Sequence, residues 1–146
     1  MKTILRAAAV LAGLAAAAAG EGCPWLNRAT AAGVLGGAVQ ATVTPESCEF
    51  VRHEGGHEAS LRIEVRAAGA AHAHCGPGAE ALKGIGNEAA ACRFEGKAGW
   101  TSEQVVGRVR DRAFLVRIGR NEPMAAGTAL REKAREVAEQ VAGILF

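Results

Sequence analysis

The sequence Glu103-Gln-Val-Val-Gly-Arg-Val-Arg110 is followed by Asp111-Arg112 and then by Ala113-Phe-Leu-Val-Arg-Ile-Gly119. Two alternating runs rich in β-branched residues flank a short polar turn, which predicts an antiparallel hairpin. Asp111 favours the reversal because its side chain can hydrogen-bond to its own backbone two residues on. We therefore expect a small antiparallel sheet built around this hairpin.

Further strands are expected before the hairpin. Residues 60–66 alternate cleanly, with Leu61, Ile63 and Val65 toward the core and charged residues toward water. The other predicted strands are residues 39–44, 47–52 and 90–94, separated by a turn at 45–46, a polar loop at 53–58 and a turn at 95–99. The segment 67–81, rich in Ala and Gly, could be a short helix or an irregular crossover.

Two helices are predicted. Asn27 is a good N-cap for a short helix over residues 28–35, which ends at Gly36-Gly37. A long amphipathic helix is expected over residues 124–145. Its apolar stripe contains Leu130, Ala134, Val137, Ala138, Val141 and Leu145, and its solvent face contains Arg131, Glu132, Arg135, Glu136, Glu139 and Gln140. The expected class is α+β, with both helices packed on an antiparallel sheet of about five to six strands.

The first residues are typical of an export signal. A basic start at Lys2 and Arg6 precedes the apolar run 7–19, which ends in three alanines. This order predicts a secretory signal peptide at residues 1–19 and a single exported domain at 20–146. The run is too short and Ala-rich for a membrane span, which needs about 20 strongly apolar residues. Lipid anchoring at Cys23 is not expected, because Gly20 and Glu21 do not fit a lipobox.

The charge balance argues against nucleic acid as a partner. Without Lys2 and Arg6, the 17 basic residues fall to 15 and equal the 15 acidic residues. The exported domain then has no net field to attract a polyanion or anionic lipid.

The cysteines indicate an oxidising compartment. Four cysteines in a small exported domain predict two disulfides. We favour Cys23–Cys48 and Cys75–Cys92, because each pair closes a local loop between consecutive elements. There is no Cys-x-x-Cys spacing, so neither a thioredoxin-like site nor a zinc knuckle is indicated.

The sequence contains few residues in patterns typical of cofactor binding or catalysis. Gly84-x-Gly86-x-x-Ala89 resembles a dinucleotide fingerprint, but without a βαβ unit it is interpreted as a structural turn. The only Asp is Asp111, and no nucleophile elbow surrounds any serine. The sequence therefore predicts no catalytic residues and no cofactor.

Four histidines and one tryptophan are the remaining candidates for a binding site. His53, His57, His72 and His74 could bind zinc or copper, since imidazole suits both metals. Trp100 follows a Gly-containing turn and could form a partner surface, with core packing as the alternative. Any pocket is expected between the sheet and the segment 67–81.

The order of the motifs also resembles a known family. A helix ending in Leu35-Gly36 precedes Cys48-Glu49-Phe50, then Gly84-Ile-Gly-Asn-Glu-Ala89, a hairpin and a final amphipathic helix. This layout is similar to small exported bacterial proteins of unknown function, many of them lipoproteins, whose domain resembles the PsbP-type α/β sandwich. The resemblance covers most of residues 23–146. It implies a fold and an export context, and it carries no enzymatic residues.

Three functions follow from these observations. The first is a non-catalytic periplasmic or secreted domain that binds a protein partner or a small ligand in the cell envelope. The second is a periplasmic metal-binding protein that uses the histidines. The third, an envelope hydrolase, has the least support.

Overall fold

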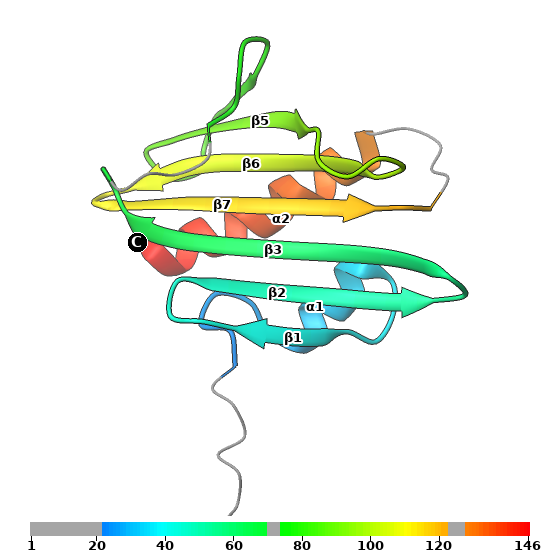
Figure 1. The fold of residues 1–146 in the computed structure, drawn as a ribbon. Coiled ribbons are helices and arrows are strands. Elements are labelled where there is room, and N and C mark those ends of the chain that lie inside the picture. Colours follow the sequence, from blue (N-terminus) through cyan, green and yellow to red (C-terminus); the bar gives the residue numbers. More distant parts are fainter. Residues whose placement is uncertain (1–21, 70–73, 123–127) are drawn as a thin grey trace, which may run out of the picture.

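The computed structural model describes residues 22–69, 74–122 and 128–146, and these form two helices and seven strands (Figure 1). The elements are α1 (Arg28–Leu35), β1 (Gln40–Val43), β2 (Ser47–Glu54), β3 (His57–Ala67), β4 (Glu80–Leu82), β5 (Glu88–Phe94), β6 (Thr101–Val109), β7 (Arg112–Arg120) and α2 (Thr128–Leu145). The predicted helix 28–35 and the central hairpin β6–β7 are confirmed. The predicted start of the last helix, residues 124–127, and the predicted signal peptide lie outside the described residues.

The strands form one antiparallel sheet in the order β1-β2-β3-β7-β6-β5-β4. Strands β1 to β3 are neighbours in chain order, and so are β4 to β7. The two groups meet where β3 pairs with β7, with Arg62 opposite Arg117. The expectation of five to six strands is wrong, because a seventh strand, β4, pairs with β5 at one edge. Its three residues, Glu80–Leu82, are too few to show an alternating pattern in the sequence.

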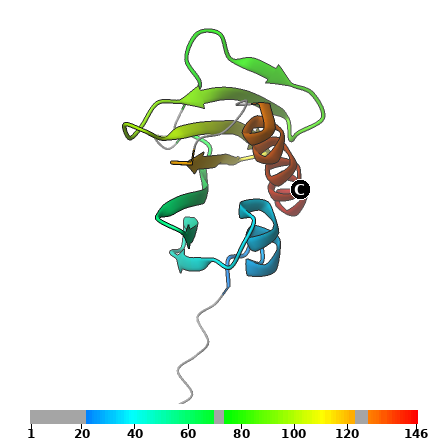
Figure 2. The ribbon, with the colours of Figure 1, turned by 90° about the vertical axis from the view of Figure 1, so that its right-hand side faces the viewer.

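Both helices pack on the same face of this sheet (Figure 2). α2 lies against β6 and β7, and α1 lies against β2 and β3. The two helices also contact each other, because the Lys133 Nζ donates to the Val34 carbonyl at 3.1 Å. The predicted stripe of α2 is buried, apart from the half-buried Leu145.

Both favoured disulfides are confirmed. Cys23–Cys48 ties the segment before α1 to the helix-covered face of β2, with Cα atoms 5.8 Å apart. Cys75–Cys92 ties the segment before β4 to the other face of β5, with Cα atoms 5.7 Å apart. The chain has no free cysteine.

One predicted loop is wrong. Residues 53–58 do not form a flexible loop, because β2 continues to Glu54 and β3 begins at His57. Gly55 and Gly56 alone make the reversal, and both have positive φ angles. The polar residues extend the hairpin because its end projects into solvent.

An ion pair of a buried arginine near the end of the β2–β3 hairpin is expected to make the free energy of unfolding sensitive to acid. Arg52, whose side chain is 8% exposed, forms ion pairs with Glu54 and Glu122. Its hydrogen bond holds the pKa of Glu122 below the ordinary value of 4.5. A carboxyl whose pKa is lowered by folding stabilises the protein above its unfolded pKa, and this contribution is lost as the pH falls through the folded pKa.

We therefore expect the free energy of unfolding to fall more steeply below about pH 4.5 in the wild type than in a Glu122→Gln variant. Urea unfolding at a series of pH values measures this slope. Glu139→Gln, which removes an exposed carboxylate on α2, serves as the control. Parallel curves for wild type and Glu122→Gln would contradict the expectation.

Candidate ligand-binding site

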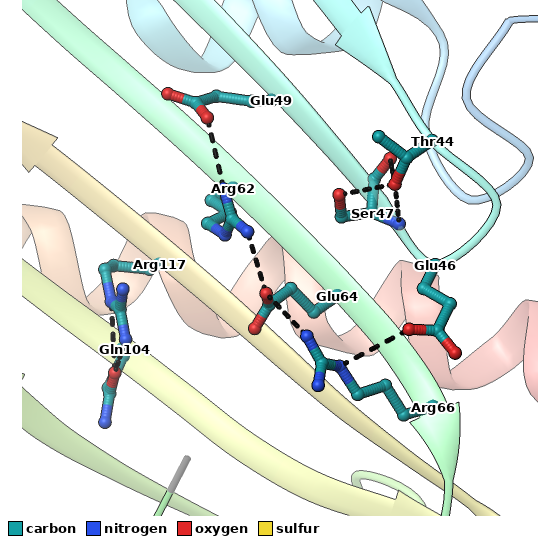
Figure 3. A network of polar contacts seen from close by, with 9 residues as sticks. All are labelled: Thr44, Glu46, Ser47, Glu49, Arg62, Glu64, Arg66, Gln104 and Arg117. Carbon is teal, nitrogen blue, oxygen red and sulfur yellow. Dashed lines mark hydrogen bonds and ion pairs between the residues drawn. The ribbon is translucent and has the colours of Figure 1, made fainter. Parts of the chain in front are cut away.

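The sheet face that points away from α1 and α2, here called the distal face, carries ordered rows of polar side chains. The register aligns Ser60, Gly119 and Ser102 across β3, β7 and β6. The next row places Arg62 beside Arg117, which in turn lies beside Gln104. Figure 3 shows that the side chains of this second row lie on the side of the sheet opposite the helices.

A half-open cavity of about 170 Å³, here called the distal-face cavity, lies over these rows beside the turn between β5 and β6. Its lining consists of Glu49, Ser60, Arg62, Phe94, Gly96, Lys97, Trp100, Ser102 and Arg117. A second cavity of about 450 Å³ adjoins it within the β5–β6 hairpin, and the two linings share Phe94, Gly96, Lys97, Trp100 and Ser102. No described residue of the segment 67–81 lines either cavity, so the expected pocket beside that segment stays a prediction.

Trp100 forms a wall of the distal-face cavity. Its side chain is half-buried, whereas Trp25 is buried in the core. A Cβ at Gly119 would lie 3.1 Å from the Trp100 Cε3 atom and 2.5 Å from the Ser102 Oγ. The glycine therefore lets the indole lie close to the sheet, so Trp100 is neither a core residue nor a fully exposed one.

Arg117 is the central cation of the distal face. Its guanidinium lies 3.5 Å from the centroid of the Phe94 ring, a cation–π contact. The Gln104 Oε1 accepts hydrogen bonds from Nε at 3.2 Å and from Nη2 at 2.9 Å. Burial lowers the pKa of Arg117, although an arginine remains protonated at physiological pH. The sheet thus holds a positive charge in a fixed orientation beside the cavity.

Arg62, in the same row, has a different environment. It donates to Glu49 at 3.2 Å and to Glu64 at 2.8 Å, and the bond to Glu64 is the main reason that its pKa is raised. Glu64 also pairs with Arg66, which continues the network along β3 (Figure 3). The charge of Arg62 is therefore balanced by its neighbours.

Lys97 is the third cation of the lining. Its Nζ lies 5.1 Å from the Trp100 ring centroid, in a second cation–π contact. Lys97 is exposed and belongs to the turn that covers the cavity. Its charge therefore adds to that of Arg117 at the cavity mouth.

The histidines predicted as metal ligands are not gathered into one site by the described residues. His53 and His57 lie at the end of the β2–β3 hairpin, where the His53 Nδ1 is 3.4 Å from a Glu58 carboxylate oxygen. His74 is exposed on the segment before β4, and His72 lies outside the described residues. Within residues 22–69, 74–122 and 128–146, no three His, Cys, Asp or Glu side chains are placed to hold a metal ion.

The remaining sequence motifs have structural roles. The glycines at 84 and 86 precede strand β5 rather than a helix, so the interpretation of this motif as a turn is confirmed. The predicted polar turn lies one residue earlier than expected, at Arg110-Asp111 instead of Asp111-Arg112, because Arg112 already belongs to β7. The Asn87 Oδ1 accepts a hydrogen bond from the Arg110 backbone N–H there.

The fold and the cavity together define a class: an α+β domain with helices on one face of an antiparallel sheet and a polar, aromatic-walled cavity on the other. The sequence matches no protein family model and no curated protein. The function must therefore be inferred from the residues that line the cavity.

Proposed function

We propose that the protein is a non-catalytic domain of the bacterial cell envelope and that it binds a small ligand in the distal-face cavity. The observation that carries this proposal is the position of Trp100, whose indole and the Phe94 ring wall a concave site with charged and hydroxyl groups. Cavities with apolar walls and a few fixed polar groups are typical of small-molecule sites.

The location follows from the covalent chemistry. Two disulfides in a chain with no free cysteine indicate an oxidising compartment outside the cytoplasm. No helix of the described residues is long and apolar enough to cross a membrane. The predicted export signal at residues 1–19 and the resemblance to exported PsbP-type domains favour the periplasm or the medium as that compartment. Cys23 in a disulfide has no thiol left for a lipid thioether, which argues against anchoring there.

The cavity has the size of a small ligand. Its volume of about 170 Å³ is close to the roughly 150 Å³ that accommodates one benzene molecule. A ligand with a single ring therefore fits this space.

Tryptophan fluorescence tests the proposal directly. The chain has two Trp and no Tyr, so a Trp25→Phe variant leaves Trp100 as the only strong fluorophore. We expect saturable changes in its emission with members of a panel of single-ring acids, amides and alcohols. Dissociation constants should be about micromolar to millimolar, because ligands gain roughly 0.3–1.5 kcal/mol per non-hydrogen atom.

The matched control is Trp100→Phe, in which the buried Trp25 reports instead. Its emission should not respond to the same compounds. If no compound in the panel changes Trp100 emission in a saturable way, the proposed function is wrong.

A further inference from the structure

The unused hydrogen-bonding capacity of Arg117 points to the chemistry of the ligand. A guanidinium has five N–H groups. The Gln104 Oε1 accepts hydrogen bonds from Nε and from one N–H of Nη2. These two bonds occupy one edge of the planar guanidinium. The other edge, formed by Nη1 and the second N–H of Nη2, has no protein partner among the described residues. This edge has the spacing that binds the two oxygens of a carboxylate in parallel.

The charges around the cavity favour an anion. The lining contains three cationic side chains, Arg62, Lys97 and Arg117, and one carboxylate, Glu49. Glu49 bonds to Arg62, and among the described residues neither Lys97 nor Arg117 forms an ion pair, although the charge of Glu64 acts on Arg117 from a greater distance. A negatively charged ligand would be attracted by these two cations.

The walls favour a flat apolar group behind that charge. The Arg117 guanidinium lies 3.5 Å from the Phe94 ring centroid, whereas the exposed Lys97 lies 5.1 Å from the Trp100 ring centroid. The Trp100 indole is therefore the more open of the two rings that line the cavity. Aromatic pairs in offset or edge-to-face contact gain free energy beyond simple burial. A single aromatic ring with one substituent also matches a volume of about 170 Å³.

We propose that the ligand of the distal-face cavity is a small aromatic carboxylate, whose carboxylate binds the free edge of Arg117 and whose ring packs beside Trp100. This inference rests on the proposed function and specifies it. The hydroxyls of Ser60 and Ser102, which also line the cavity, are further donors for the carboxylate oxygens.

Gln104 is the positioning residue of this site. It is buried, its Oε1 holds Arg117, and its Nε2 donates to the Sγ of Cys92 at 3.4 Å. The amide therefore links the Cys75–Cys92 disulfide to the guanidinium and keeps the free edge of Arg117 in place. A carboxylate at position 104 would keep the shape of this side chain but would neutralise the charge offered to the ligand.

Titration with benzoate and benzamide tests the inference, because the two compounds have nearly the same shape and differ in charge. In the wild-type protein, calorimetry should show benzoate binding at least about tenfold more tightly, since hydrogen bonds to charged groups are worth about twice neutral ones. Arg117→Met should reduce benzoate affinity to the level of benzamide. Arg108→Met, which removes an exposed arginine of the same face outside the cavity, should leave both affinities unchanged.

Gln104→Glu provides a second variant that preserves packing. It should weaken benzoate at least about fivefold and leave benzamide within about twofold, because a glutamate would compete for Arg117. A merely structural role of Gln104 would instead weaken both compounds equally, and that result would overturn its assignment. If Arg117→Met does not fold, the wild-type affinity ratio and Gln104→Glu still decide the question.

The outcomes separate this inference from the function on which it rests. Equal affinities for benzoate and benzamide in the wild type would overturn the carboxylate assignment and leave a ligand-binding cavity. Displacement of benzoate by equimolar inorganic phosphate would also overturn it, because the site would then be a general anion site. If neither compound binds and the fluorescence panel is silent, the proposed function itself is wrong.

Discussion

An Arg131→Met variant is expected to lose about 2–3 kcal/mol of its free energy of unfolding. The Arg131 Nε and Nη2 donate to one oxygen of Glu103 at 3.1 and 3.0 Å, and the Glu103 side chain is only 6% exposed. Removing one partner of a buried ion pair costs about 3–5 kcal/mol, because the other charge stays buried without compensation. Arg131 is about one-third exposed, so some water can reach Glu103 and the expected loss lies at or below the low end of this range.

The hydrogen bond to Glu103 is also the main reason that the pKa of Arg131 is raised. Because the folded pKa of Arg131 lies above its ordinary value, this stabilisation is present throughout the neutral range and is lost only in strong alkali. The loss in Arg131→Met should therefore be nearly the same at pH 6 and pH 8.

Thermal and urea unfolding measure the effect, and the midpoint should fall by roughly 10 °C. Arg135→Met is the matched control on the same helix. The Arg135 Nε lies 3.4 Å from a carboxylate oxygen of Glu139, and both side chains are exposed. The free energy of unfolding should therefore change by less than about 0.5 kcal/mol. The double variant Glu103→Leu/Arg131→Met should recover most of the loss, since an apolar pair can replace a buried ion pair. Equal losses in Arg131→Met and Arg135→Met would show that the pair does not act as described.

A Cys23→Ala/Cys48→Ala variant should lose about 3–4 kcal/mol, because the disulfide closes a loop with a sequence separation of 25 residues. Cys48 is fully buried, so the lost sulfur contacts add to the entropic effect. The protein should remain folded at low temperature and unfold at a clearly lower midpoint. A fully reduced wild-type protein should be less stable still.

Cys75→Ala/Cys92→Ala is the informative comparison. Its separation of 17 residues predicts a similar entropic loss of about 3 kcal/mol. This pair also contacts Gln104, so its removal should weaken benzoate binding, whereas removal of Cys23–Cys48 should not. Equal stability of both double variants and the wild type under oxidising conditions would contradict a stabilising role for the disulfides.

Local patterns predicted much of the fold. Asn27 caps α1 as expected, with its Oδ1 accepting from the Thr30 backbone N–H at 2.7 Å. The alternation of Leu61, Ile63 and Val65 correctly identified the buried face of β3. These signals are visible because each depends on residues a few positions apart in the sequence.

The site could not be predicted in the same way, because it depends on strand register. Arg62 and Arg117 become neighbours only when β3 pairs with β7, and Gln104 joins them only through β6. The ion pair of Arg131 could not be predicted from the local sequence either. Its place in the helical pattern suggested a solvated residue, but Glu103 on the helix-covered face of β6 is its partner. The Gly-containing turn before Trp100 was the only local signal near the cavity.

A spectrum of the indole N–H groups tests the central claim most directly. The oxidised wild-type protein has two tryptophans and should give two indole signals in a ¹H–¹⁵N spectrum. On titration with benzoate, we expect the Trp100 signal to shift in a saturable manner while the signal of the buried Trp25 stays in place. A stationary Trp100 signal, or a shift of Trp25 instead, would contradict ligand binding in the distal-face cavity.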